Sequence, residues 1–232
     1  MQKTKKHFGI VYNAPVTLTF ALLCVAELIL QSKVFGAVPR LFVAPSRPGT
    51  DLALNFKAPA EYLRLFLHVL AHSDLEHLIS NLSFLLLLGP GLEERFGGPL
   101  LALMMTATAF ATAVVNACFV SVGLLGASGV VFMMILLSSY TTIDRSQIPL
   151  TFVLICILYI GNELLAFREE TQAGISALAH ITGGICGSLF GFLTAPDKKS
   201  PARKKAPASK TAEQKDAWKT KTPQNQTDPR GY

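Results

Sequence analysis

The hydrophobic positions of this 232-residue chain form continuous runs rather than alternating patterns. The longest stretch without Asp, Glu, Lys or Arg is 48 residues long and lies between Arg95 and Asp144. Shorter uncharged windows cover Phe8–Ala26, His77–Leu92, Ser146–Asn162 and Thr171–Pro196. A bilayer core of ~30 Å needs roughly 20 helical residues, so the longest window is sufficient for two spans and each other window for about one. Runs of this length exclude strands and predict membrane-spanning helices.

We expect an all-α fold with six membrane helices. These helices cover Ala14–Leu30, Leu75–Gly89, Leu100–Val120, Ser128–Tyr140, Pro149–Leu165 and Gly174–Ala195. A loop rich in proline, Phe35–Ala60, and an amphipathic stretch, Glu61–Ala71, separate the first two helices. The predicted organisation is an N-terminal segment (1–13), a six-helix membrane domain (14–195) and a C-terminal tail (196–232).

Composition agrees with a polytopic membrane protein. Only 16% of the residues are charged and 50% are hydrophobic, whereas a soluble domain carries about 25% charged residues. The four cysteines lie in apolar runs without a CxxC pair, so no disulfide scaffold is expected. The first apolar run continues beyond the length of a signal peptide, and we interpret it as a retained span.

The basic residues predict an orientation. The tail holds ten of the 21 Lys and Arg and few aliphatic residues, so we expect it to be disordered and attracted to lipid headgroups rather than to nucleic acid. With both termini in the cytoplasm, fifteen Lys and Arg lie inside and six outside, as the positive-inside rule prefers. The second, fourth and sixth helices then begin at the outer surface.

Polar side chains in these helices are costly and need an explanation. His77 and Asn81 are four residues apart on one face of the second helix, and His68 and His72 share that spacing. Paired histidines can bind zinc, but a third ligand is missing because Asp74 and Glu76 point elsewhere on a helix. We therefore expect no metal and no cofactor.

Two further groups contain small residues. Gly126-Ala127-Ser128-Gly129 opens the fourth helix and by itself indicates only close helix packing. The sixth helix carries Ala179-His180 followed by Gly183, Gly187 and Gly191, a glycine stripe that shares a face with the histidine. If this stripe packs on the fourth helix, His180 meets Ser128.

All three groups lie near the outer ends of their helices, which favours one polar cavity open to the outside. A serine, a histidine base and nearby hydrogen-bond donors are the minimal set for acyl transfer. Ser128 would be the nucleophile, and His180 would take its proton and return it to the leaving amine. His77, the Asn81 amide and the Ser128 backbone N–H are candidate oxyanion donors. Glu163 is the nearest acid, but we do not assign it a role.

The ordered motifs between residues 64 and 191 resemble the rhomboid intramembrane serine proteases. The matching residues are His72…His77-x3-Asn81, Leu88-Gly89, Glu93-x-Arg95-x-Gly97, Gly126-x-Ser128-Gly129 and Ala179-His180-x2-Gly183-x3-Gly187. The resemblance implies a six-helix core with a Ser128–His180 dyad in a water-filled cavity, and an oxyanion site at His77, Asn81 and the Ser128 amide. It implies cleavage of transmembrane proteins near the outer end of their helix.

The resemblance also implies supporting roles and has two departures. His72 would support the loop, and Glu93 and Arg95 the inner end of the second helix. The outer loop lacks the tryptophan of many bacterial members. Phe132 stands where a tyrosine is common four residues after the serine, and it can stack on the histidine but has no hydroxyl.

Two alternatives stay open. A non-catalytic relative that binds membrane clients would lack the serine or the histidine, and both are present. A channel or transporter would favour inverted repeats, which we do not find; Glu27 is its best support, and we expect that side chain to reach the interface or a loop partner. Expected partners are single-pass membrane substrates and the bilayer of a bacterial plasma membrane. The oligomeric state is left open.

Overall fold

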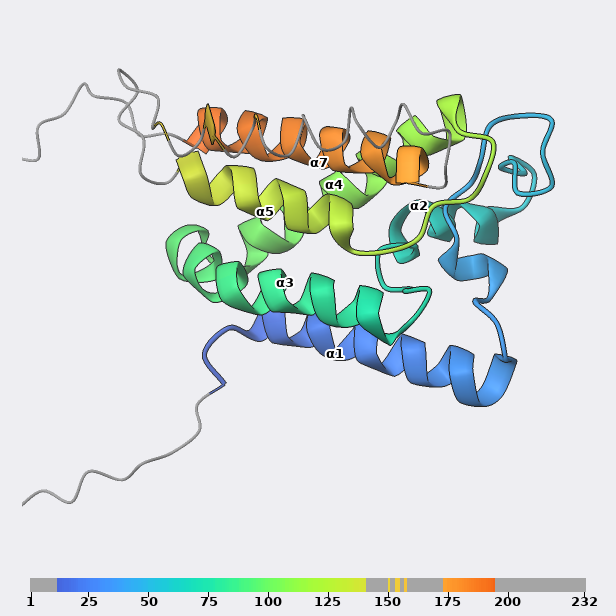
Figure 1. The fold of residues 1–232 in the computed structure, drawn as a ribbon, viewed down its shortest axis with the longest axis horizontal. Coiled ribbons are helices and arrows are strands. Elements are labelled where there is room, and N and C mark those ends of the chain that lie inside the picture. The colour runs from blue at the N-terminus through green and yellow to red at the C-terminus, as the bar shows by residue number, and fades with distance from the viewer. Residues whose placement is uncertain (1–11, 141–149, 151–152, 155–156, 158–172, 195–232) are drawn as a thin grey trace, which may run out of the picture. The chain divides into compact units, whose positions relative to one another are not determined.

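The computed structural model describes residues 12–140, 150, 153–154, 157 and 173–194, and all regular secondary structure in these residues is helical (Figure 1). The helices are α1 (Pro15–Leu30, continued by a π-helical turn at Gln31–Phe35), two 3₁₀ turns (Arg40–Phe42 and Pro59–Leu63), α2 (Arg64–Leu67), α3 (Leu75–Phe96), α4 (Gly98–Phe119), α5 (Ser128–Tyr140) and α7 (Ala173–Thr194). Four helical segments in the described residues are long and apolar enough to span a bilayer: Pro15–Phe35, Leu75–Phe96, Gly98–Phe119 and Ala177–Thr194. The apolar part of α5, Ser128–Ser139, is shorter. Most of the predicted fifth helix, including Glu163, and the predicted tail lie outside the described residues.

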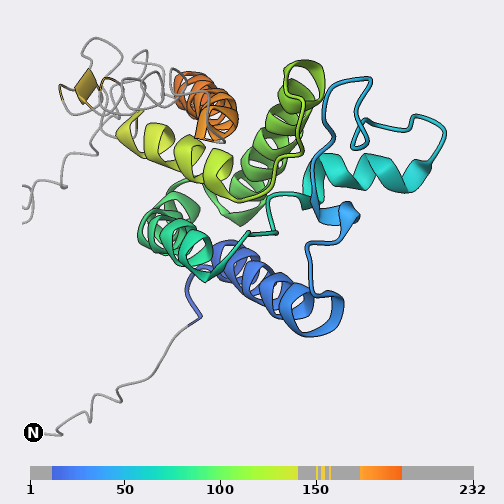
Figure 2. The same cartoon turned by 45° about the vertical axis from the view of Figure 1, so that its right-hand side comes forward.

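Helices α1 and α3 lie side by side (Figures 1 and 2). The first turn of α1 has no side-chain cap of its own, and Glu93 of α3 provides one. The Glu93 carboxylate accepts the backbone N–H groups of Val16 and Thr17 and the Thr17 hydroxyl, each at 2.9 Å. A carboxylate at a helix N-terminus satisfies unpaired N–H groups and complements the helix dipole.

The predicted end of this second helix at Gly89 is wrong. Helix α3 continues through Pro90 to Phe96. Membrane helices tolerate an internal proline where neighbouring groups compensate. Here the bonds from Glu93 to α1 anchor the turn that follows the proline.

Helix α5 is short, yet it lies in the middle of the core. Val130, Met133, Met134 and Leu137 are all fully buried. The helix packs against α3, α4 and most extensively α7 (Figure 2). Its first turn is therefore fixed by neighbours on several sides.

The outer loop is fastened by a buried arginine. The Arg64 guanidinium donates to the carbonyl oxygens of Val43 at 2.8 Å and Leu52 at 3.0 Å, and it pairs with Glu61. The stretch Glu61–Ala71, predicted to be amphipathic, is helical as far as Leu67. The arginine explains how a loop without tryptophan is held in place.

Candidate active site

Ser128 is the first residue of α5 and follows a turn that contains Gly126. Gly126 has φ +117°, a conformation that residues with a side chain rarely adopt. The His77 ring packs against it, since a methyl group at Gly126 would lie 2.8 Å from Cε1 and 2.9 Å from Nε2. Both the backbone conformation and the contact with α3 therefore require glycine.

The segment before α3 holds the same turn by two hydrogen bonds. The N–H of Gly126 donates to the carbonyl oxygen of His68 at 2.9 Å. The N–H of Ala127 donates to Nε2 of His72 at 3.5 Å. The two amides directly before the serine are thus both engaged by this segment.

The hydrogen bonds of His72 define its protonation state. Its Nδ1 lies 3.1 Å from the carbonyl oxygen of Leu70, so the neutral ring carries its proton on Nδ1 and accepts from Ala127 at Nε2. Burial, together with His77 nearby, holds the pKa of His72 at about 4, below its ordinary value of 6.5. His72 is therefore neutral near pH 7 and acts on the backbone beside Ser128 rather than on a reacting atom.

His77 lies in the first turn of α3, which Asp74 caps by accepting the His77 N–H at 2.8 Å. The Ser73 hydroxyl donates to Asp74 at 2.6 Å and lies 3.2 Å from Nδ1 of His77. With its hydrogen given to Asp74, Ser73 accepts from Nδ1–H, and Nε2 of the neutral His77 ring is then an acceptor. His77 donates from Nε2 only when the ring is protonated or the Ser73 hydroxyl turns toward Nδ1.

Asn81 follows one turn later and is buried. Its side-chain nitrogen donates to the carbonyl oxygen of His77 at 3.0 Å. An amide nitrogen carries two hydrogens, so the second can serve another acceptor.

Helix α7 meets the first turn of α5 at backbone distance. A methyl group at Gly183 would overlap the carbonyl of Gly129, and one at Gly129 would lie 3.4 Å from the carbonyl oxygen of Ala179. The glycine stripe thus packs on the serine-bearing helix, as its spacing predicts. Ser128 and His180 are the sequence neighbours of this contact.

The His180 ring stacks on Phe132, with centroids 4.2 Å apart and planes inclined by 2°. Phe132 is one helical turn after Ser128, so the two share a face of α5. The His77 ring, against Gly126, and the His180 ring, against Phe132, therefore both lie near the start of α5.

Other predicted residues lie elsewhere. Glu93 is in the last turns of α3 with Arg95, whose guanidinium carbon lies 5.6 Å from the centroid of the Phe96 ring. Gly187 packs against the carbonyl of Met133, one turn beyond the Gly183 contact.

The expectation for Glu27 is wrong. The side chain does not reach the interface: the residue is only 5% exposed, and neither carboxylate oxygen has a hydrogen-bond partner among the described residues.

No group of three His, Cys, Asp or Glu side chains converges in the described residues. His68 instead places Nε2 3.4 Å from the hydroxyl of Thr112 on α4. That no metal is required remains a prediction.

Asn116 is a residue that the sequence interpretation missed. Its side-chain nitrogen donates to the carbonyl oxygens of Pro45 and Val122, both at 2.9 Å, and so ties α4 to the outer loop and to the turn before Ser128. The available signal was an amide within the 48-residue uncharged window, where a polar group needs a partner.

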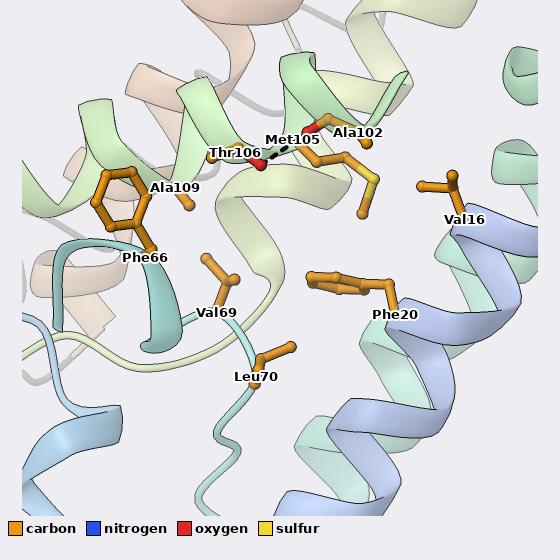
Figure 3. A pocket seen from close by; sticks show the side chains of 9 residues that line it. All are labelled: Val16, Phe20, Phe66, Val69, Leu70, Ala102, Met105, Thr106 and Ala109. Atoms are coloured by element: carbon orange, nitrogen blue, oxygen red, sulfur yellow. Dashed lines mark hydrogen bonds between the residues drawn. The ribbon is translucent and has the colours of Figure 1, made fainter. Parts of the chain in front are cut away.

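A separate pocket of about 160 Å³ lies between α1, the residues around Val69, and α4 (Figure 3). Its lining is apolar apart from Thr106, whose hydroxyl donates to the Ala102 carbonyl at 2.8 Å. It contains no nucleophile paired with a base, so the candidate chemistry belongs to the turn at Ser128.

The family model for the Rhomboid domain matches residues 59–197. The chain belongs to the rhomboid family. The match covers every residue of the candidate site, and together with the apolar helices it identifies this rhomboid as an integral membrane protein. A search among curated proteins gives no match. Helix α1 precedes the matched part of this rhomboid.

Proposed function

We propose that this rhomboid is an intramembrane serine endopeptidase with Ser128 as nucleophile and His180 as general base and acid. The observation that carries the proposal is the contact of α5 with α7, in which Gly183 meets Gly129 and His180 stacks on Phe132. That contact supports a histidine beside the face of α5 that bears the serine. The rhomboid family consists largely of serine proteases but includes non-catalytic members, so activity needs its own test.

The reaction follows from these groups. Ser128 Oγ attacks the peptide carbonyl carbon while its proton moves to His180. The tetrahedral intermediate then breaks the C–N bond, and His180 gives the proton to the leaving amine. A water molecule, deprotonated by His180, repeats the attack on the acyl-enzyme and releases the new carboxylate and Ser128.

The developing oxyanion needs donors. The Ser128 backbone N–H and the second Asn81 amide hydrogen supply them without a change of protonation. His77 contributes when its Nε2 carries a proton.

The proposed substrates are single-pass membrane proteins, cut near the outer end of their helix. The proposed setting is a bacterial plasma membrane with both termini cytoplasmic, which the Lys and Arg distribution supports.

The test is labelling of the purified full-length protein with a fluorophosphonate probe, together with cleavage of one transmembrane substrate. Ser128→Ala should lose both labelling and cleavage. Ser121→Ala, an exposed serine before the same turn, is the matched control and should keep both. Unchanged cleavage by a folded Ser128→Ala protein would end the protease proposal. A wild-type protein that binds membrane substrates, but is not labelled by the probe and does not cleave them, would favour the non-catalytic alternative.

A further inference from the structure

Gln31 connects helix α1 to the segment that holds the Ser128 turn. It is the residue after the last turn of α1 and is only 6% exposed. Its side-chain nitrogen donates to the carbonyl oxygen of His72 at 2.7 Å, across 41 residues of sequence. Its side-chain oxygen has no hydrogen-bond partner in the described residues, so the side-chain amide acts there only as a donor, through its nitrogen.

The His72 carbonyl belongs to a stretch between α2 and α3 without helical structure. A backbone segment of this kind depends on side chains and on other loops for its hydrogen bonds. The same residue accepts the Ala127 N–H at its ring Nε2. Two bonds therefore run in series from Gln31 to His72 and from His72 to Ala127, which precedes Ser128.

We infer that Gln31 is a positioning residue for the reaction, acting on Ser128 through His72 and Ala127. The inference rests on the proposed function. Gln31 lies outside the residues that the family model matches, and it touches no reacting group. Gln31 would act by fixing the position of the turn at Ser128, where a displacement of ~1 Å can lower the rate by roughly 10²-fold.

Two substitutions separate the hydrogen bond from packing. Gln31→Leu removes the donor and keeps the size approximately. Gln31→Glu keeps the shape and removes the donor while ionised, but a protonated carboxyl group can donate again. Ser32→Ala is the matched control, because Ser32 is the exposed next residue and bonds only to Ile29 within α1.

The experiment measures kcat and KM of the full-length protein on one transmembrane substrate between pH 8 and pH 5. For Gln31→Leu we expect kcat to fall by about 10- to 100-fold with KM within about twofold of wild type. For Gln31→Glu we expect the same loss at pH 8, and a rate relative to wild type that rises as the pH falls. Other titratable groups lie on α1, on the segment before α3 and on α3, and every variant keeps them: Glu27, His68, His72, Asp74 and His77. Dividing the rate of each variant by the wild-type rate at the same pH therefore cancels the effect of their titration.

Hydrogen exchange of peptides that cover residues 120–130 provides a readout without turnover. Gln31→Leu should speed exchange there, and Ser32→Ala should not. Wild-type kcat and exchange in Gln31→Leu would overturn the inference. So would a loss of kcat in Gln31→Glu that stays equal at every pH, because a role as hydrogen-bond donor predicts recovery when the carboxyl group is protonated. Failure of the protease proposal is distinguishable: wild type and Ser128→Ala would then be equally inactive, and the positioning role would fall with it.

Discussion

The three candidate oxyanion donors differ in how readily each can donate. Nε2 of His77 is an acceptor while Ser73 gives its hydrogen to Asp74, whereas Asn81 keeps a second amide hydrogen. The amide of Ser128 donates in any protonation state. Loss of the Asn81 donor should therefore weaken the oxyanion site without removing every donor from it.

We predict that Asn81→Ala retains measurable cleavage while Ser128→Ala and His180→Ala do not. Removal of one oxyanion donor typically lowers kcat by ~10²–10³-fold, and less where other donors compensate. The double variant Ser128→Ala/His180→Ala should be no worse than either single variant, because the pair acts as a unit. Initial cleavage rates on one substrate, with a thermal melt for each variant, measure this. Activity as low in Asn81→Ala as in Ser128→Ala would contradict the assignment.

Glu27 offers a second test at a single residue. Both carboxylate oxygens are buried without a partner in the described residues. Burying an unpaired polar group costs about 1–3 kcal/mol, so we predict that Glu27→Leu raises the melting temperature. Glu94→Leu, at an exposed position of α3, is the control and should change stability little. A lower melting temperature for Glu27→Leu would mean that the carboxyl group has a stabilising partner.

At the scale of elements, the α5–α7 interface depends on specific glycines and not on glycine content. A methyl group at Gly183 would overlap the Gly129 carbonyl, whereas one at the adjacent Gly184 would lie 3.8 Å from Leu136 Cγ, an ordinary contact. The overlap at Gly183 involves backbone that cannot move aside.

We therefore predict that Gly183→Ala abolishes cleavage and lowers the melting temperature, because α7 must move away from the turn at Ser128. Gly184→Ala should keep activity and gain up to about 1 kcal/mol of helix propensity. Paired melts and cleavage assays of the two variants decide the matter. Equal behaviour of the two would show that the glycine contact does not position α7.

The same interface shows how much of the structure could be predicted from the sequence. Glycines every four residues on the face of His180 predict a close helix contact, and the structure has it at Gly183 and Gly187. The end of α3 was not predictable from local signals, because Pro90 is a breaker and the hydrogen bonds that Glu93 accepts come from a helix 76 residues away in the sequence.

Side-chain partners were the least predictable part of the site. The roles of Gln31 and Asn116 depend on carbonyl oxygens of loops, which leave no periodic pattern in the sequence.

At the scale of the whole molecule, the loss of stability in mild acid depends on two histidines before α3. Burial holds the pKa of His68 at about 4, and burial with His77 nearby holds that of His72 at about 4, against an ordinary value of 6.5. Above pH 6.5 both are neutral whether folded or unfolded, so they add no pH dependence. Between pH 6.5 and 4 the unfolded chain binds protons that the folded protein excludes, so this stability is lost progressively as the pH falls.

We predict that the melting temperature of the full-length protein is level above pH 6.5 and falls toward pH 4. The contribution of the fully buried His68 is on the order of 3 kcal/mol by the lower end of this range. His68→Leu should flatten the slope, because it removes one of the two excluded protonations and leaves His72 in place. Glu61→Gln is the control. Arg40 and Arg64 hold the pKa of Glu61 at about 2, against an ordinary value of 4.5. The stability that this carboxylate gives the folded protein is therefore lost only below about pH 4.5. Melts at half-unit pH steps measure all three proteins. A slope in His68→Leu as steep as in wild type would mean that the segment before α3 takes up protons without unfolding.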